Sequence, residues 1–235
     1  MPDLQRTIDQ NLTRVRGAIS EATARAGRAP EAVKLIGVTK YVGPEVVRLL
    51  VTAGLCDLAE SRPQQLWDKA AALGDLSIRW HQIGHLQRNK VRRTLPLVAM
   101  VESLDSVRLA AAIDQTAAEL GLRVPVLLEV NISGEQAKHG FTPDEVEAAL
   151  PSLVALNHIQ VRGLMGMAGM RADMQDARRQ FAKLRTLRDR LQAACPNGAD
   201  LTELSMGMSA DFEAAIAEGA TMVRIGSALF EGVPC

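Results

Sequence analysis

The sequence predicts a single (β/α)8 barrel with one extra helix at its N-terminus. Two observations support this fold. Strand and helix signals alternate eight times within about 200 residues, which matches the number of units in such a barrel. No linker rich in Ser, Pro or Gly divides the chain, so residues 1–235 are expected to form one domain. A doubly wound parallel sheet is the competing fold, but it usually has about five to seven strands.

The order of the elements follows from the spacing of apolar residues. The first helix, about Asp3–Gly27, carries apolar residues at helical spacing. Eight short apolar runs then predict strands at Leu35–Thr39, Leu55–Ala59, Ile78–Ile83, Val98–Ser103, Val124–Asn131, Ile159–Met165, Thr202–Ser205 and Thr221–Ile225. The helices after them are expected at Pro44–Ala53, Pro63–Leu73, Gln87–Arg93, from the N-cap Asp105 to Leu120, Pro143–Leu150, Met174–Ala194, Ala210–Glu218 and from Ser227.

Composition excludes several classes of partner. Lys plus Arg and Asp plus Glu number 27 each, so no net field favours nucleic acid or a membrane surface. No apolar run approaches the roughly 18 residues of a membrane span. Cys56, Cys195 and Cys235 are far apart, which is typical of a reducing compartment, and no Cys/His/Asp group has zinc spacing. We therefore expect a cytoplasmic protein without a metal.

Lys40 is the first candidate for chemistry, because it follows the apolar run of the first predicted strand. Desolvating an ammonium group costs several kcal/mol unless it is paired or neutralised. A lysine at the mouth of a barrel is therefore a candidate Schiff-base nucleophile. The alternative is a lysine whose amine reaches past the strand end into water.

The loops after the last two predicted strands have the composition of a phosphate site. The seventh strand leads into Ser205-Met206-Gly207-Met208-Ser209, with Ser209 as the expected N-cap of the next helix. The eighth ends in Arg224-Ile225-Gly226-Ser227, again a glycine and a hydroxyl before a helix. Barrels of this type often hold phosphate at these two loops, although plain helix capping is the alternative for each.

Arg224 is expected to point into the barrel, because Met222 and Arg224 alternate with Val223 and Ile225. The alternative is an outward arginine paired with a carboxylate of a helix. Other polar or flexible residues end the remaining strands, among them Asn131, Met165 and the histidines of Trp80-His81-Gln82-Ile83-Gly84-His85. Gly84 lies between His81 and His85 and argues against a helical metal-binding pair.

As a set, these motifs resemble the pyridoxal 5′-phosphate (PLP) homeostasis protein family, also called the YggS/PROSC family. The resemblance runs from the first strand to the last. It rests on Val38-Thr39-Lys40, Trp80 to Lys90, Glu102-Ser103-Leu104-Asp105, Glu129 to Ser133, Lys138-His139-Gly140-Phe141, Gly163 to Met167, Leu204 to Ser209 and Val223 to Ser227.

The resemblance implies a barrel related to the N-terminal domain of alanine racemases, with PLP held as a Schiff base on Lys40. It implies phosphate contacts from Ser209, Gly226 and Ser227, with Ser205 and Gly207 beside them. Arg224 would face the pyridine nitrogen, which weakens the ring as an electron sink. Around the cofactor it implies Ser61, His85, Asn131 and Met165. Ala59-Glu60-Ser61 stands where the family usually has Gly-Glu-Asn, which puts the contact from Ser61 in doubt.

The resemblance favours a carrier that buffers PLP, releases it to apo-enzymes and acts as a monomer. Two features of the sequence point the same way. The residues after the eighth strand are too few for a second domain, and the single tyrosine, Tyr41, adjoins Lys40. No distant tyrosine can then serve as a base on the opposite face of the cofactor. The alternatives are a small PLP-dependent amino-acid racemase or lyase, and a phosphate-binding barrel without PLP.

Overall fold

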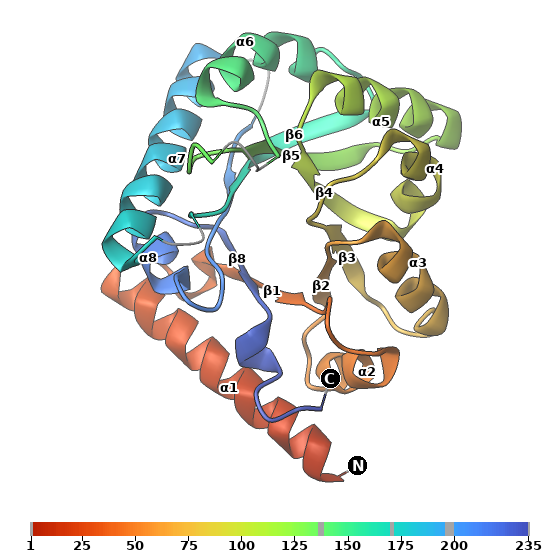
Figure 1. Cartoon of the computed structure of the whole chain (residues 1–235), viewed down its shortest axis with the longest axis vertical. Coiled ribbons are helices and arrows are strands. Elements are labelled where there is room, and N and C mark those ends of the chain that lie inside the picture. The colour runs from red at the N-terminus through yellow and green to blue at the C-terminus, as the bar shows by residue number, and fades with distance from the viewer. Residues whose placement is uncertain (1, 136–138, 170–171, 196–199, 235) are drawn as a thin grey trace.

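Eight parallel strands close into a barrel in sequence order, which confirms the predicted fold (Figure 1). The computed structural model of the chain describes residues 2–135, 139–169, 172–195 and 200–234. The strands are β1 (Lys34–Val38), β2 (Asp57–Glu60), β3 (Arg79–Gln82), β4 (Val98–Leu104), β5 (Val124–Val130), β6 (Ile159–Gly166), β7 (Glu203–Ser205) and β8 (Met222–Ile225). Because all strands are parallel, their carboxyl ends meet at one rim of the barrel.

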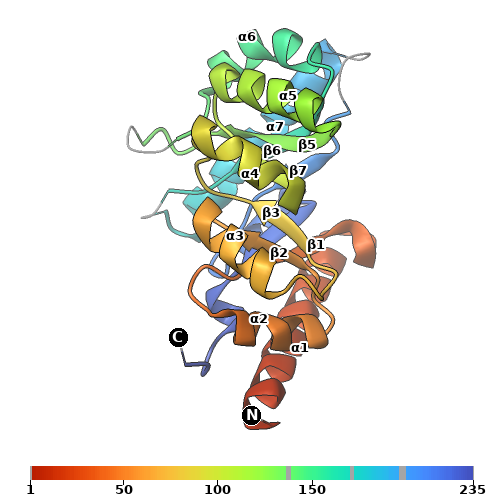
Figure 2. The same cartoon turned by 90° about the vertical axis from the view of Figure 1, so that its right-hand side faces the viewer.

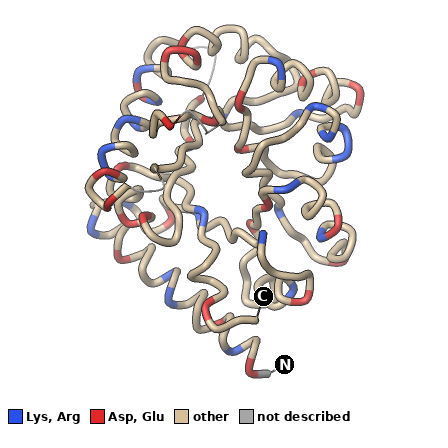
Figure 3. Tube along the Cα trace, in the orientation of Figure 1, with Lys and Arg blue, Asp and Glu red and all other residues tan. Residues whose placement is uncertain are grey.

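Helices cover the outside of the barrel. They are α1 (Pro2–Arg25), α2 (Pro44–Thr52), α3 (Pro63–Ala72), α4 (Val91–Thr94), α5 (Val107–Leu120), α6 (Pro143–Val154), α7 (Met174–Ala194) and α8 (Phe212–Ala217). Four short 3-10 turns are η1 (Pro30–Ala32), η2 (Arg88–Lys90), η3 (Leu95–Leu97) and η4 (Ser227–Leu229). Acidic and basic residues are mixed over this outer layer (Figure 3). Among the described residues, no helix has both the length and the apolar character that crossing a membrane requires.

The extra helix α1 lies on the outside of the barrel, against α8 (Figure 1) and against α2 (Figure 2). Its apolar stripe is buried there, including Ile8, Leu12 and Val15. The side chain of Asn11 donates hydrogen bonds to the carbonyl oxygens of Leu229, at 3.2 Å, and Glu231, at 2.9 Å. Helix α1 therefore fixes the segment that follows β8, which is the loop predicted to hold phosphate.

Three helix starts differ from the prediction. Ser106, not Asp105, is the N-cap of α5, because its hydroxyl accepts from the N–H of Leu109 while Asp105 contacts His85. Helix α8 begins at Phe212 after Asp211, because the Ser209 hydroxyl contacts the β8 loop instead. The predicted helix at Gln87–Arg93 is instead two short elements, η2 and α4, and Pro96 in η3 stops α4 from continuing as a regular helix.

The barrel interior combines a small apolar layer with charged groups. Ile36, Val38, Ala59 and Met222 pack together inside it. Alternate residues of the same strands, such as Leu58 and Val223, face the helices and join the main core. Polar side chains are also buried within the sheet, where they form the floor beneath the rim: His81, Glu102, Ser205 and Arg224.

Candidate functional site

Two backbone N–H groups converge on one point between the β7 and β8 loops. The hydroxyl oxygen of Ser209 accepts from the N–H of Gly226 at 3.3 Å and from the N–H of Ala228 at 3.4 Å. Both distances are long for N–H···O bonds, so the hydroxyl is a weak acceptor for this pair. Convergent backbone N–H groups form a concavity that favours an anion. The exposed hydroxyl of Ser227 belongs to the same loop.

This pair of loops lies against the end of β1. A side chain at Gly226 would meet the carbonyl oxygen of Val38 at 3.4 Å, so the loop backbone runs close to that strand end. Lys40 follows Val38 by two residues and is exposed, with its Nζ 4.9 Å from the centre of the Tyr41 ring. Lys40 thus carries an exposed amine at the strand end that the loop with the convergent N–H groups approaches.

The buried lysine near this strand end is Lys69 of α3, which the sequence did not single out. Its Nζ contacts Glu60 and donates to the carbonyl oxygen of Thr39 at 2.6 Å. The Thr39 hydroxyl also donates to Glu60, at 2.6 Å. These contacts hold the main chain immediately before Lys40. The lysine that is desolvated and therefore needs a paired carboxylate is Lys69, not Lys40.

Gly207 serves packing in this structure. Its φ is +93°, and a Cβ there would lie 2.6 Å from the Cβ of Ala215 in α8. A side chain would therefore clash with the helix, which explains the glycine without any ligand. Its neighbour Ser205 is fully buried in the barrel, so the two residues do not share one exposed loop.

Arg224 points into the barrel, as strand alternation predicted. Its Nη1 donates to the Ser205 hydroxyl at 2.5 Å, and its Nη2 donates to the Gly166 carbonyl oxygen at 3.0 Å. Glu102 lies 3.9 Å from Nη1. Burial lowers the pKa of Arg224, and the neighbouring carboxylates oppose that effect.

A chain of buried polar side chains continues from Arg224 across the barrel. Ser205 donates to Glu102 at 2.6 Å, and Glu102 lies 2.7 Å from Nδ1 of His81. The Nε2 of His81 lies 3.5 Å from Asp57, which Arg79 also pairs with. Burial acts to lower the pKa of His81, but hydrogen bonds to Asp57 and Glu102 outweigh it and raise that pKa to about 9.

The two carboxyl partners of His81 shift in the opposite direction. Burial acts to raise the pKa of Asp57 and of Glu102, but their hydrogen bonds to His81 hold both below the usual range. His81 is therefore an imidazolium between two carboxylates at neutral pH. The sequence placed His81 in a loop or at a strand end; it is the penultimate residue of β3, and its side chain is buried.

The β3, β4 and β5 loops form the opposite part of the rim. The amide of Asn131 is engaged within its own loop, because Nδ2 donates to the Glu135 carbonyl oxygen at 2.8 Å and Oδ1 accepts from Gly134 and Ser133. His85 is exposed and its Nδ1 lies 2.7 Å from Asp105. Lys138, part of the motif beside His139, lies outside the described residues.

Met165, Ser61 and Glu129 also lie near the rim. Met165 is fully buried and pairs in register with Glu129 across β5 and β6. Ser61 accepts from the Gln82 side chain through its carbonyl oxygen, at 3.2 Å. Within the described part of the chain, Oε2 of Glu129 is buried without a hydrogen-bond partner. Burial and the charge of Asp105 raise the pKa of Glu129 to about 7.

Known proteins match the chain over nearly its whole length. The family model "Alanine racemase, N-terminal domain" matches residues 10–234. The pyridoxal phosphate homeostasis protein of Aquifex aeolicus is 42% identical over 221 residues, covering 94% of this chain and 96% of that protein. Its counterpart from Deinococcus radiodurans is 43% identical over 217 residues, covering 92% and 97%.

Solved structures agree with this assignment. PipY of Synechococcus elongatus, solved with PLP bound, superposes with a TM-score of 0.84 at 35% identity and covers 95% of this chain and 99% of that one. An alanine racemase of Clostridium difficile shares the fold alone, with a TM-score of 0.70 at 20% identity, covering 92% of this chain and 55% of that one. The chain belongs to the alanine racemase N-terminal domain family and, within it, to the pyridoxal phosphate homeostasis proteins.

Proposed function

We propose that this protein binds PLP reversibly, buffers its concentration and delivers it to apo-enzymes, and so maintains vitamin B6 and amino-acid homeostasis. Lys40 holds the cofactor as a Schiff base, in which its amine replaces the aldehyde oxygen and water leaves. The remaining contacts that we propose come from Ser61, His85, Asn131, Met165, Ser205, Gly207, Ser209, Arg224, Gly226 and Ser227.

One observation carries this proposal: convergent N–H groups lie beside the strand end that carries Lys40. A phosphate oxygen can replace the Ser209 hydroxyl as acceptor for the N–H groups of Gly226 and Ala228, with shorter, charge-assisted bonds. The Ser209 hydroxyl then becomes free to donate to the same phosphate. A nearby solvated amine is the group that an aldehyde needs, so the residues fit PLP.

The environment of Arg224 favours carrying PLP over catalysing a reaction with it. Both of its terminal nitrogens already donate to protein oxygens, which fixes the guanidinium in one orientation. An arginine donates and does not accept, so a ring nitrogen facing it stays unprotonated. An unprotonated ring withdraws electrons weakly, which suits storage better than carbanion chemistry.

The direct test is an absorption spectrum before and after borohydride reduction, followed by mapping of the modified lysine. We expect PLP to be trapped on Lys40, and Lys40→Ala to remove the absorbance band of the bound cofactor. The matched control is Lys34→Ala, because Lys34 is exposed at the other end of the same strand. Retention of the band in Lys40→Ala would refute the proposed linkage.

A second candidate function is amino-acid racemisation or a lyase reaction, favoured by the pair of His85 and Asp105. A carboxylate 2.7 Å from Nδ1 orients the imidazole so that Nε2 can take a proton. Incubating the PLP-loaded protein with single amino acids, and following product chirality, separates the two functions. We expect no turnover, and turnover at ordinary enzyme rates would refute the proposed carrier function.

The setting that we propose is the cytoplasm, with the protein acting as a monomer. Cys56 and Cys195 are free thiols in the structure, which is consistent with a reducing compartment. Light scattering of the purified chain checks the monomer directly.

A further inference from the structure

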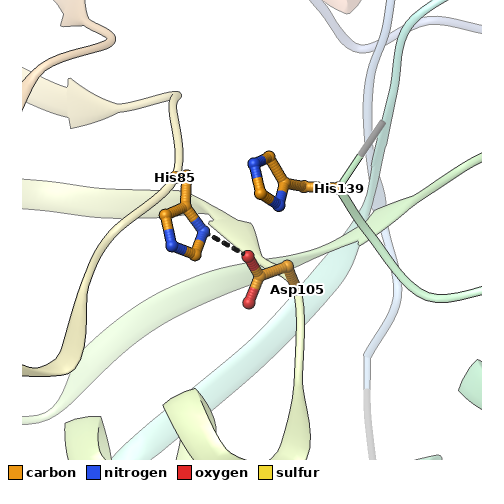
Figure 4. A group of neighbouring side chains, drawn as sticks. All are labelled: His85, Asp105 and His139. Carbon is orange, nitrogen blue, oxygen red and sulfur yellow. Dashed lines mark hydrogen bonds and ion pairs between the residues drawn. The ribbon is translucent and has the colours of Figure 1, made fainter. Parts of the chain in front are cut away.

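Three loops at the barrel rim bring two imidazoles and a carboxylate together. His85 follows β3, Asp105 follows β4, and His139 lies in the loop after β5. One potential ligand atom from each lies within 4.8 Å of the other two (Figure 4). The rings of His85 and His139 are stacked, with centroids 4.4 Å apart and 13° between their planes. No sequence spacing signalled this group, because its members are 20 and 34 residues apart (105 − 85 and 139 − 105).

The backbone holds these ligands in place. Phe141 donates its N–H to the Glu129 carbonyl oxygen at 2.8 Å, and its carbonyl oxygen accepts from Asn131 at 2.9 Å. Gly140 has a φ of +107°, and a Cβ there would lie 2.8 Å from the Glu129 carbonyl oxygen. The chain therefore passes tightly against β5 immediately after His139, which limits where that imidazole can move.

Hydrogen bonds to two neighbouring side chains orient the carboxylate of Asp105. Its Oδ1 accepts from the Ser106 hydroxyl at 3.1 Å, which leaves Oδ2 directed at His85. Its side chain is only 8% exposed, whereas that of His85 is 42% exposed. Such outer hydrogen bonds orient metal-binding carboxylates in proteins. Glu129 lies close enough to Asp105 to interact with it electrostatically, and its buried Oε2 has no hydrogen-bond partner among the described residues.

We propose that His85, Asp105 and His139 bind a divalent transition-metal ion such as Zn²⁺ or Co²⁺ at the barrel rim. Two imidazoles and one carboxylate are a ligand set that such ions accept, with the remaining positions open to water. With metal–ligand bonds of about 2.1 Å, tetrahedral donors lie roughly 3.4 Å apart. The potential ligand atoms already lie within 4.8 Å of one another. A bound metal would displace the proton between Nδ1 of His85 and Oδ2 of Asp105, and that proton would be released to water.

The test is a Co²⁺ titration of the full chain, after dialysis against a chelator and without PLP. We expect one equivalent to bind, and His85→Gln or His139→Gln to weaken binding about tenfold or more, as loss of even an outer-shell group does. His158→Gln is the matched control, because His158 is 41% exposed and lies 3.8 Å from Asp114. The unfolding midpoint of each variant checks that the fold is intact.

A second readout locates the ion directly. The chain has four histidines, so their ring-proton NMR signals are resolvable. We expect bound Co²⁺ to shift the signals of His85 and His139 and to leave that of His158 unchanged. Equal weakening by His158→Gln, unaltered binding in both site variants, an intense near-ultraviolet band from thiolate ligation, or no binding at all would each overturn the proposal.

Discussion

The two halves of the barrel rim are built from different kinds of groups. The half formed by β7, β8 and β1 presents backbone N–H groups and hydroxyls, above the paired charges of Arg224 and Glu102. The half formed by β3, β4 and β5 presents titratable side chains, among them His85, Asp105 and His139, and the buried Oε2 of Glu129, which has no hydrogen-bond partner in the described part of the chain. The first half is suited to an anion through fixed dipoles, whereas the second is suited to protons and cations through its side chains.

This difference has a structural cause. Backbone N–H groups are positioned by strand register and by the turn that follows, so no single side-chain change removes them. On the opposite half the groups are side chains, so each can be removed by a single substitution.

The largest expected effect is on stability, from Arg224→Met. This change removes one of the two cations next to the buried Glu102, which keeps only His81, and it removes the donor to Ser205 and Gly166. Breaking a buried charge network on one side costs about 3–5 kcal/mol. Urea unfolding followed by circular dichroism measures this loss.

The control for Arg224 is Arg14→Met, which breaks an ion pair with Glu231 whose two side chains are 56% and 68% exposed. Exposed pairs contribute less than about 1 kcal/mol. Similar losses in both variants would mean that the floor beneath the phosphate loops is not the rigid part of the rim.

His81 gives the next largest effect, and it depends on pH. Its pKa is raised from 6.5 to about 9 in the folded protein, so the folded state binds a proton more tightly than the unfolded chain. The resulting stabilisation, about 3 kcal/mol, is fully present below pH 6.5 and is lost as pH rises through 9. The free energy of unfolding, measured between pH 7 and 10, should fall in the wild type and stay flatter in His81→Gln. A wild-type curve as flat as that of the variant would contradict the assignment of His81 as an imidazolium.

Glu129, on the opposite half, also makes stability fall as pH rises, but through loss of a proton that leaves a buried charge. Its pKa is raised from 4.5 to about 7, so the folded protein loses stability as pH rises from about 4.5 to 7. Glu129→Gln removes this penalty, and we expect it to be more stable than the wild type at pH 8 by about 1–2 kcal/mol. The two proteins should have closer stabilities at pH 4.5. A lower stability of the variant at pH 8 would show that the carboxylate is paired in solution.

The sequence predicted the barrel and the inward direction of Arg224, because both depend on periodicity along one chain segment. It could not predict that Lys69 meets Glu60, or that Ser205 joins Glu102 to Arg224. Those contacts depend on the register between strands and on which helix residue reaches a strand end. Ser209 shows the same limit: its sequence pattern predicted a helix cap, and its hydroxyl instead bridges to the neighbouring loop.

The smallest effect, and the sharpest test of the comparison, is on PLP affinity in Ser209→Ala. The hydroxyl contributes one hydrogen bond to a bound phosphate, so its removal should weaken PLP binding about tenfold, or about 1.4 kcal/mol, with little change in stability. The N–H groups of Gly226 and Ala228 remain and retain most of the affinity. Asn131→Ala on the opposite half, where the amide is engaged in its own loop, should weaken binding less. Fluorescence titration with PLP measures both variants. If Asn131→Ala is the more damaging change, the phosphate is held from the opposite half of the rim, and fixed dipoles are not what selects it.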